Sequence, residues 1–275
     1  MSGDFLNLAR ILDRTRAEGP GLRFCIWTQG CLRNCPGCCN AAMQPLEPRM
    51  LVPTGELVSL VLAGAEASGL EGVTFLGGEP LLQAKGLAAV ARAARGAGLT
   101  VMVFTGFTLA ECRADPLPGV PELLAETDVL VDGPYRAECP EPARNWVGSS
   151  NQRFHYLTGA YGPAIETDPA FRGRVEFRVE GDTLRMNGCP RTLPERFSLE
   201  RAFSRDQGNR QGARNLSRAR LVRCPLRKTE FSVSGLPKTG GVAVFRRFRG
   251  ARPRDFAFVC GPFPPATQSS VADAP

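Results

Sequence analysis

The chain has 275 residues, of which 43% are hydrophobic and 22% charged, as expected of a soluble globular protein with a substantial core. No run approaches the roughly 20 apolar residues that span a bilayer, and Asp4 precedes a first apolar stretch without a small-residue cleavage site, so we expect a cytoplasmic protein. The net charge of +7 is uneven, because residues 190–275 hold 17 Lys and Arg against 6 Asp and Glu, whereas residues 1–189 hold 17 against 21.

Residues 1–189 alternate strand-like and helix-like segments, beginning with residues 4–12, which fit either a helix or a strand. Short apolar runs rich in aromatic and β-branched residues then predict strands at 23–28, 72–78, 99–106, 128–133 and 175–181. Between these strands the pattern predicts helices over 56–68, 81–98 and 121–127. Thr54 is the expected N-cap of the first helix, and Gly69 is expected to end it.

This alternation predicts an α/β fold. Strands that alternate with helices indicate βαβ units and a parallel sheet, and their nearly continuous apolar character fits a sheet covered on both faces. Only about 190 residues carry the pattern, whereas a full eightfold barrel takes about 250, so we expect a partial, open βα barrel. We predict a core domain over residues 1–189. Residues 190–275 are expected to form an Arg-rich C-terminal extension, poorly ordered except for strand-like pieces at 242–248 and 256–260.

Four of the ten cysteines crowd into nine residues, where Cys31, Cys35 and Cys38 have the spacing Cys-x3-Cys-x2-Cys and Cys39 follows directly. A disulfide framework is not expected in a long chain without a secretory signal. Structural zinc takes four ligands, but the chain has no second cysteine pair, its single histidine, His155, is distant, and the Cys39 side chain is expected to point elsewhere. Three thiolates on a 4Fe–4S cluster would leave one iron open to a small molecule with an amine and a carboxylate. Zinc and a plain electron-transfer cluster remain alternatives.

The cysteine loop after an apolar strand resembles that of the radical S-adenosylmethionine (SAM) superfamily. Within it, the chain resembles the activating proteins of anaerobic ribonucleotide reductase, which also have a glycine at the position of Gly37 in CPGC. The resemblance covers roughly residues 5–189, and nothing after Cys189 resembles the family. The other motifs, in the family's order, are EGPGLR at 18–23, LGGEP at 76–80, TGFT at 105–108, VDGPY at 131–135 and GSSNQR at 148–153.

The resemblance implies two cofactors, a 4Fe–4S cluster and SAM, with SAM bound at the iron that lacks a cysteine. The implied metal ligands are Cys31, Cys35 and Cys38. The implied SAM-binding residues are Gly77, Gly78, Glu79 and Pro80, with Asn40, Thr105 and Asp132 as further candidates. Paired glycines at a strand end let the backbone approach a ligand, and ligands of open parallel sheets lie beyond the carboxyl ends of strands. The alternatives are an ordinary strand-to-helix turn for the glycines and a turn role for Asp132.

Three other residues are candidates for a role at the site or in the core. Residues 145–156 are polar and are expected to form a loop, where Arg153 would be able to bind a carboxylate or phosphate with both arms of its guanidinium. His155 is expected to be structural. Trp27, on the strand that enters the cysteine loop, is expected to belong to the core. No catalytic residue is predicted.

The resemblance implies an oxidoreductase that reductively cleaves SAM to a 5′-deoxyadenosyl radical. The implied reaction is hydrogen abstraction from a glycine of a partner glycyl radical enzyme, with flavodoxin or ferredoxin as electron donor. A second hypothesis is a radical SAM enzyme that modifies a peptide, nucleoside or nucleic acid, since a basic extension attracts phosphates. A third is a non-catalytic iron–sulfur or zinc interaction module, which would bind metal without SAM. No membrane partner is expected.

Overall fold

The computed structural model describes residues 4–172, 175–180, 183–188, 230–232, 242–247 and 256–260. The chain divides into two compact units. One contains Met1–Arg174, Asn187–Thr192 and Cys224–Lys228, and the other contains Val175–Met186, Leu193–Arg223 and Thr229–Pro275. The described strands form one seven-stranded and one five-stranded sheet. None of the described helices has the length and apolar character needed to cross a membrane.

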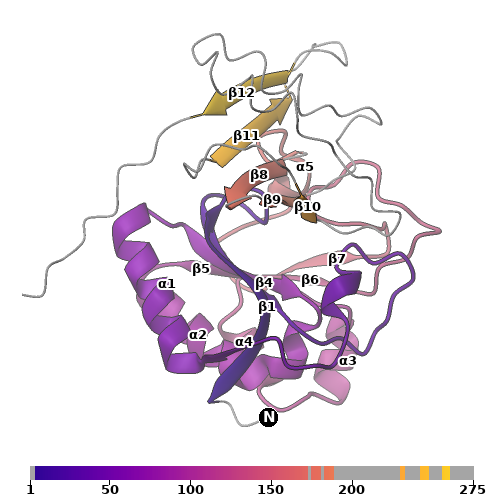
Figure 1. Cartoon of the computed structure of the whole chain (residues 1–275). Helices are drawn as coiled ribbons and strands as arrows, with labels where there is room; N and C mark the ends of the chain where they lie inside the picture. Colours follow the sequence, from indigo (N-terminus) through magenta and orange to yellow (C-terminus); the bar gives the residue numbers. More distant parts are fainter. Residues whose placement is uncertain are drawn as a thin grey trace, which may run out of the picture. The chain divides into compact units, whose positions relative to one another are not determined.

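The seven-stranded sheet has the strand order β3-β1-β2-β4-β5-β6-β7. Figure 1 labels β1, β4, β5, β6 and β7 of this sheet. Its strands are β1 (Phe5–Thr15), β2 (Arg23–Thr28), β3 (Met50–Pro53), β4 (Gly72–Gly77), β5 (Thr100–Phe104), β6 (Val129–Asp132) and β7 (Arg153–Tyr156). The central strands β2, β4, β5 and β6 run parallel, while β1, β3 and β7 pair antiparallel toward the two edges. The expected α/β fold with parallel strands at its centre is confirmed.

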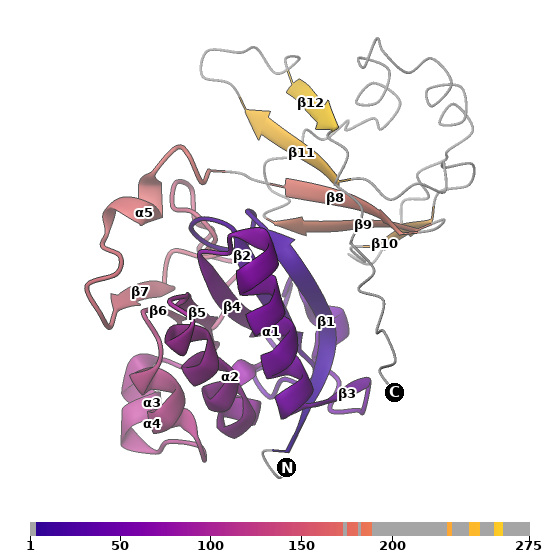
Figure 2. The same cartoon turned by 90° about the vertical axis from the view of Figure 1, so that its left-hand side faces the viewer.

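Helices alternate with the strands along the chain. They are α1 (Thr54–Ser68), α2 (Ala84–Gly96), α3 (Leu109–Ala114), α4 (Val120–Ala125) and α5 (Ala164–Thr167), with short 3-10 helices η1 (Ala41–Met43) and η2 (Pro80–Gln83). Figure 2 shows α1 and α2 side by side against the sheet, and α2 also packs on α4. Gly69 ends α1 in the left-handed conformation, with φ of 60°, as its position after the apolar pattern predicted.

The core has one layer on each face of this sheet. In β2, Phe24 and Ile26 belong to the main cluster, which includes the buried residues of α1 and α2, whereas Cys25 and Trp27 belong to a smaller cluster. Since successive side chains of a strand point to opposite faces, the two clusters mark the two faces of the sheet. Burial on both faces explains why the parallel strands are apolar at nearly every position.

Three local features differ from expectation or resolve it. Residues 4–12, which fitted a helix or a strand, lie mostly in β1. Thr54 is the first residue of α1, and Pro53, the last residue of β3, takes the N-cap position without a side-chain hydrogen bond. The expectation of a loop over 145–156 is wrong at Arg153–Tyr156, which form β7. In this edge strand Phe154 and Tyr156 alternate with polar residues and pack on the core, but a pattern of four residues is too short to distinguish a strand from a loop.

The five-stranded sheet has the order β10-β9-β8-β11-β12. Its strands are β8 (Val175–Glu180), β9 (Thr183–Gly188), β10 (Glu230–Ser232), β11 (Val242–Arg247) and β12 (Phe256–Cys260). The predictions of strands at 175–181, 242–248 and 256–260 are therefore confirmed, while β9 and β10 had not been expected. The rest of the Arg-rich extension lies outside the described residues, and the domain boundary after residue 189 stays a prediction.

Candidate active site

The parallel strands bring the predicted site residues to one edge of the seven-stranded sheet. β2 and β4 are in register, with Thr28 opposite Gly77 at their carboxyl ends, and the cysteine loop and the GGEP motif begin there. At the ends of the next two strands, Thr105 follows β5 directly and Asp132 is the last residue of β6. This is the edge at which open parallel sheets bind ligands.

Backbone hydrogen bonds close the base of the cysteine loop. The N–H of Gly30 donates to the Met43 carbonyl at 2.8 Å, and the N–H of Cys31 donates to the Gln44 carbonyl at 2.9 Å. Within the loop, the Cys38 N–H donates to the Cys35 carbonyl at 3.2 Å, and Gly37 has a φ of 77°. In such a turn the third residue has a positive φ, which favours glycine, and proline is common at the second position. CPGC thus places two cysteines at opposite ends of one tight turn.

The cysteine sulfurs receive hydrogen bonds suited to thiolate ligands. The Asn40 N–H donates to Cys38 Sγ at 3.4 Å, and a hydrogen bond from the Cys39 thiol is the largest of the effects that lower the pKa of Cys38 to about 6. The Cys39 thiol, expected to point elsewhere, therefore lies beside Cys38, since loop residues do not alternate as strand residues do. Burial raises the pKa of Cys31, although backbone N–H donors near its sulfur oppose the rise.

This donor set fits a cluster better than a single ion. In the described part of the chain, no three His, Cys, Asp or Glu side chains lie close enough together to hold one metal ion. A 4Fe–4S cluster takes each cysteine at a different iron, so its thiolates need not converge on one point. Three half-exposed thiols on one loop, with N–H groups near the sulfurs of Cys31 and Cys38, meet that requirement.

The GGEP segment packs backbone to backbone against the cysteine loop. The Gly78 N–H donates to the Thr28 carbonyl and the Glu79 N–H donates to the Gly30 carbonyl, both at 2.8 Å. A Cβ at residue 78 would meet the Gly30 and Met43 carbonyl oxygens, so only glycine fits there. The Asn40 side chain donates to the Gly77 carbonyl at 3.1 Å, which joins two predicted SAM-binding residues.

Glu79 is buried, and both of its carboxylate oxygens accept hydrogen bonds from other residues of the protein. Oε1 accepts from the Leu81 N–H at 3.0 Å and from the Thr105 hydroxyl at 2.8 Å, and Oε2 accepts from the Gly106 N–H at 2.8 Å. Burial raises the pKa of this carboxyl, and the three donors offset part of the rise. Pro80 begins η2 directly after it. Glu79 therefore ties the GGEP segment to the turn that follows β5.

Asp132 and His155 form a pair beside this turn. Oδ2 of Asp132 accepts from the Leu109 N–H at 2.6 Å and lies 2.9 Å from Nε2 of His155, without the geometry of a hydrogen bond. Arg153 is exposed on the same strand as His155. Trp27 is buried, as expected of a core residue, and lies under the guanidinium of Arg10.

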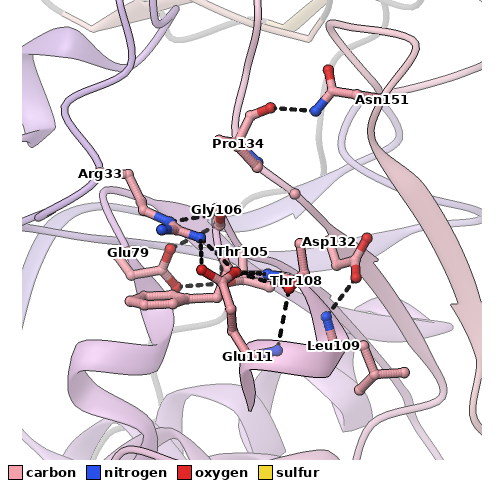
Figure 3. Close-up of polar contacts among 12 residues, drawn as sticks. Arg33, Glu79, Thr105, Gly106, Thr108, Leu109, Glu111, Asp132, Pro134 and Asn151 are labelled. Atoms are coloured by element: carbon pink, nitrogen blue, oxygen red, sulfur yellow. Dashed lines mark hydrogen bonds and ion pairs between the residues drawn. The ribbon is translucent and has the colours of Figure 1, made fainter. Parts of the chain in front are cut away.

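Sequence reasoning missed Arg33, which lies between the first two cysteines. Figure 3 shows its guanidinium directed at Gly106 and Glu111, where Nε donates to the Gly106 carbonyl at 2.8 Å and Nη2 donates to Glu111 Oε2 at 2.7 Å. The sequence could have indicated its partner Glu111, because Thr108 and Glu111 have the spacing of a capping box. They form one at the start of α3.

Known proteins match the half of the chain that carries this site. A family model described as a 4Fe-4S single cluster domain matches residues 17–155. The anaerobic ribonucleoside-triphosphate reductase-activating protein of Salmonella typhimurium is 34% identical over 146 residues, which are 51% of this chain and 92% of that protein. The Escherichia coli protein of the same name is 31% identical over 151 residues, with the same coverage. The pyruvate formate-lyase-activating enzyme of Staphylococcus epidermidis is 47% identical over 70 residues, 24% of this chain and 28% of that enzyme.

Proposed function

The chain belongs to the 4Fe-4S single cluster domain family, and on this premise we propose that it activates a glycyl radical enzyme of the anaerobic ribonucleotide reductase type. It is an enzyme of the radical SAM class, and its cofactors are a 4Fe–4S cluster and SAM. The observation that carries the proposal is the match to reductase-activating proteins over 92% of their length, with the cysteine loop and GGEP segment joined at one sheet edge.

Cys31, Cys35 and Cys38 are the residues proposed to hold the cluster. When bound and reduced, the cluster supplies the electron that cleaves SAM into methionine and a 5′-deoxyadenosyl radical, which takes a hydrogen atom from the glycine of the partner. The protein's part is to bind, to orient and to exclude water.

The remaining site residues are proposed to shape the SAM site. Gly77 and Gly78 let the GGEP segment lie directly against β2 and the cysteine loop, where a Cβ would meet backbone atoms, and the backbone held there is proposed to contact SAM. Glu79 holds the GGEP backbone through its three hydrogen bonds, and Pro80 directs the chain into η2. Asn40, Thr105 and Asp132, which lie on the cysteine loop and at the ends of β5 and β6, are proposed to face SAM or the substrate.

A protein substrate suits the open βα barrel that we propose for the core, because an open barrel leaves room for a loop of the partner. Flavodoxin or ferredoxin is the proposed electron donor. A contact of the Arg-rich extension with nucleic acid stays a prediction, since most of that segment lies outside the described residues.

The test is the appearance of a glycyl radical on a purified anaerobic ribonucleotide reductase incubated with this protein, SAM and a reductant. We expect an electron paramagnetic resonance doublet that requires all three additions and disappears when the reductase glycine is replaced by alanine. SAM cleavage without a radical on any glycyl radical enzyme tested would instead favour a peptide, nucleoside or nucleic-acid substrate.

A further inference from the structure

Arg33 connects the cysteine loop to the turn between β5 and α3. Its Nε donates to the Gly106 carbonyl at 2.8 Å, and its Nη2 lies 2.7 Å and 2.9 Å from the two carboxylate oxygens of Glu111. Its Cζ lies 4.3 Å from the centroid of the Phe107 ring. A quarter of the side chain is exposed, so these contacts are partly screened from water.

Gly106 is held from two sides. Its N–H donates to Glu79 Oε2 at 2.8 Å, and its carbonyl accepts from Arg33 Nε at 2.8 Å. A Cβ on this residue would lie 2.8 Å from Arg33 Cγ and 3.4 Å from Glu79 Oε2, so the glycine lets both side chains approach (Figure 3). Gly106 thus joins the segment that carries the first two cysteines to the segment proposed to bind SAM.

The carboxylate that receives Arg33 is itself fixed. Oε2 of Glu111 accepts from the Thr108 N–H at 2.6 Å, while the Glu111 N–H donates to the Thr108 hydroxyl at 3.2 Å. Because this capping box anchors Glu111 to the first turn of α3, the guanidinium binds a rigid partner.

We propose that Arg33 is a positioning residue that holds the cysteine loop at a set distance from the SAM site, by bridging Gly106 and Glu111. This deepens the proposed function, because the site it aligns is the one assigned to the cluster and SAM. Its geometry requires an arginine, since one guanidinium serves the carbonyl and the carboxylate while its Cζ lies over the Phe107 ring. A lysine ammonium keeps the charge but cannot make these contacts together.

The first experiment measures hydrogen–deuterium exchange of the metal-free protein, so its result does not depend on the proposed function. We expect Arg33→Lys and Arg33→Gln to speed exchange at residues 29–38 and at the Gly106 amide by about tenfold, without changing exchange in β4. The matched control is Arg92→Gln, which breaks an Arg–Glu pair of 3.1 Å between α2 and Glu126. Exchange in the two Arg33 variants equal to that in the control would overturn the proposal.

The second experiment measures SAM affinity and iron content after anaerobic reconstitution. We expect Arg33→Lys to keep about four irons per chain and to bind SAM about tenfold more weakly than wild type. Wild-type SAM affinity in Arg33→Lys would overturn the proposal, because a positive charge alone would then suffice. Loss of iron without faster hydrogen–deuterium exchange would also overturn it, because Arg33 would then act in retaining the cluster. If wild type binds no SAM, the proposed function fails, while the exchange result still decides the role of Arg33.

Discussion

A methyl group at residue 78 tests how closely the GGEP segment must approach the cysteine loop. The Cβ of a Gly78→Ala variant would meet the Gly30 carbonyl oxygen, and it would lie 2.7 Å from the Met43 carbonyl oxygen and 2.9 Å from the Gly30 carbonyl carbon. All three atoms are backbone, so none can move away as the end of a flexible side chain would. The two carbonyls also accept the hydrogen bonds that fix the loop, from the N–H groups of Glu79 and Gly30.

The expected magnitude follows from overpacking. Forcing a methylene-sized group into a packed site costs about 1–3 kcal/mol, and here the loop is expected to move away from β4. A penalty of about 2 kcal/mol lowers the ratio of aligned to displaced loop roughly 30-fold, and SAM affinity should fall by up to that factor. The assay is a SAM titration of the reconstituted Gly78→Ala protein, together with its iron content and its thermal unfolding temperature.

Gly96→Ala is the matched control, because a Cβ on this last residue of α2 meets nothing within 4 Å. It should bind SAM as wild type does and should be no less stable, since alanine is favoured over glycine in a helix by up to about 1 kcal/mol. If Gly78→Ala binds SAM with wild-type affinity, the close approach of the two segments is not needed, and the reasoning is refuted.

Substitutions at three further positions test the contacts around the site and in the core beneath it. Arg23→Met removes a fully buried guanidinium that donates to three carbonyls, so urea unfolding should show a free energy of unfolding lower by about 3 kcal/mol. A decrease below about 1 kcal/mol would argue against a stabilising role of these hydrogen bonds. Thr105→Val removes a donor to the buried carboxylate of Glu79 and should cost about 1–2 kcal/mol on unfolding, whereas Thr105→Ser should keep most of the stability; equal losses would contradict the hydrogen bond. Hydrogen bonds from the Thr108 N–H, which has the larger effect, and from Arg33 lower the pKa of Glu111 from 4.5 to about 2. The ionised carboxylate therefore stabilises the fold above pH 4.5, and this stabilisation is lost as the pH falls through 2. The stability difference between wild type and Glu111→Gln should shrink over that interval in acid unfolding curves, and a difference independent of pH would contradict the assignment.

The centre of the fold follows from the sequence because the parallel strands are buried on both faces. Segments such as 23–28 and 72–77 are short, mostly apolar and buried at nearly every position, which is typical of strands covered on both faces. The edge strands of the sheet are harder to predict from the sequence. β7 carries Arg153 and His155 and lacks a fully buried side chain, so pairing with β6, which depends on the tertiary fold, decides its structure.

The candidate site is predictable where short motifs dictate the backbone. The Pro-Gly turn in CPGC and the paired glycines of GGEP impose local geometry that spacing alone reveals. Arg33 could not be found this way, because its partners, Gly106 and Glu111, are more than 70 residues away in the chain. A long side chain can reach many surfaces, and only the packing of the β5–α3 turn against the cysteine loop selects one.

The most direct test of the radical SAM assignment is the formation of 5′-deoxyadenosine. The protein would be reconstituted anaerobically with iron and sulfide, reduced with dithionite, and incubated with SAM and a glycyl radical enzyme, with products separated by chromatography. A variant with Cys31→Ala, Cys35→Ala and Cys38→Ala is the control. We expect 5′-deoxyadenosine from wild type and none from the variant. Wild-type protein that binds iron but forms no 5′-deoxyadenosine, or a variant that forms as much as wild type, would contradict it.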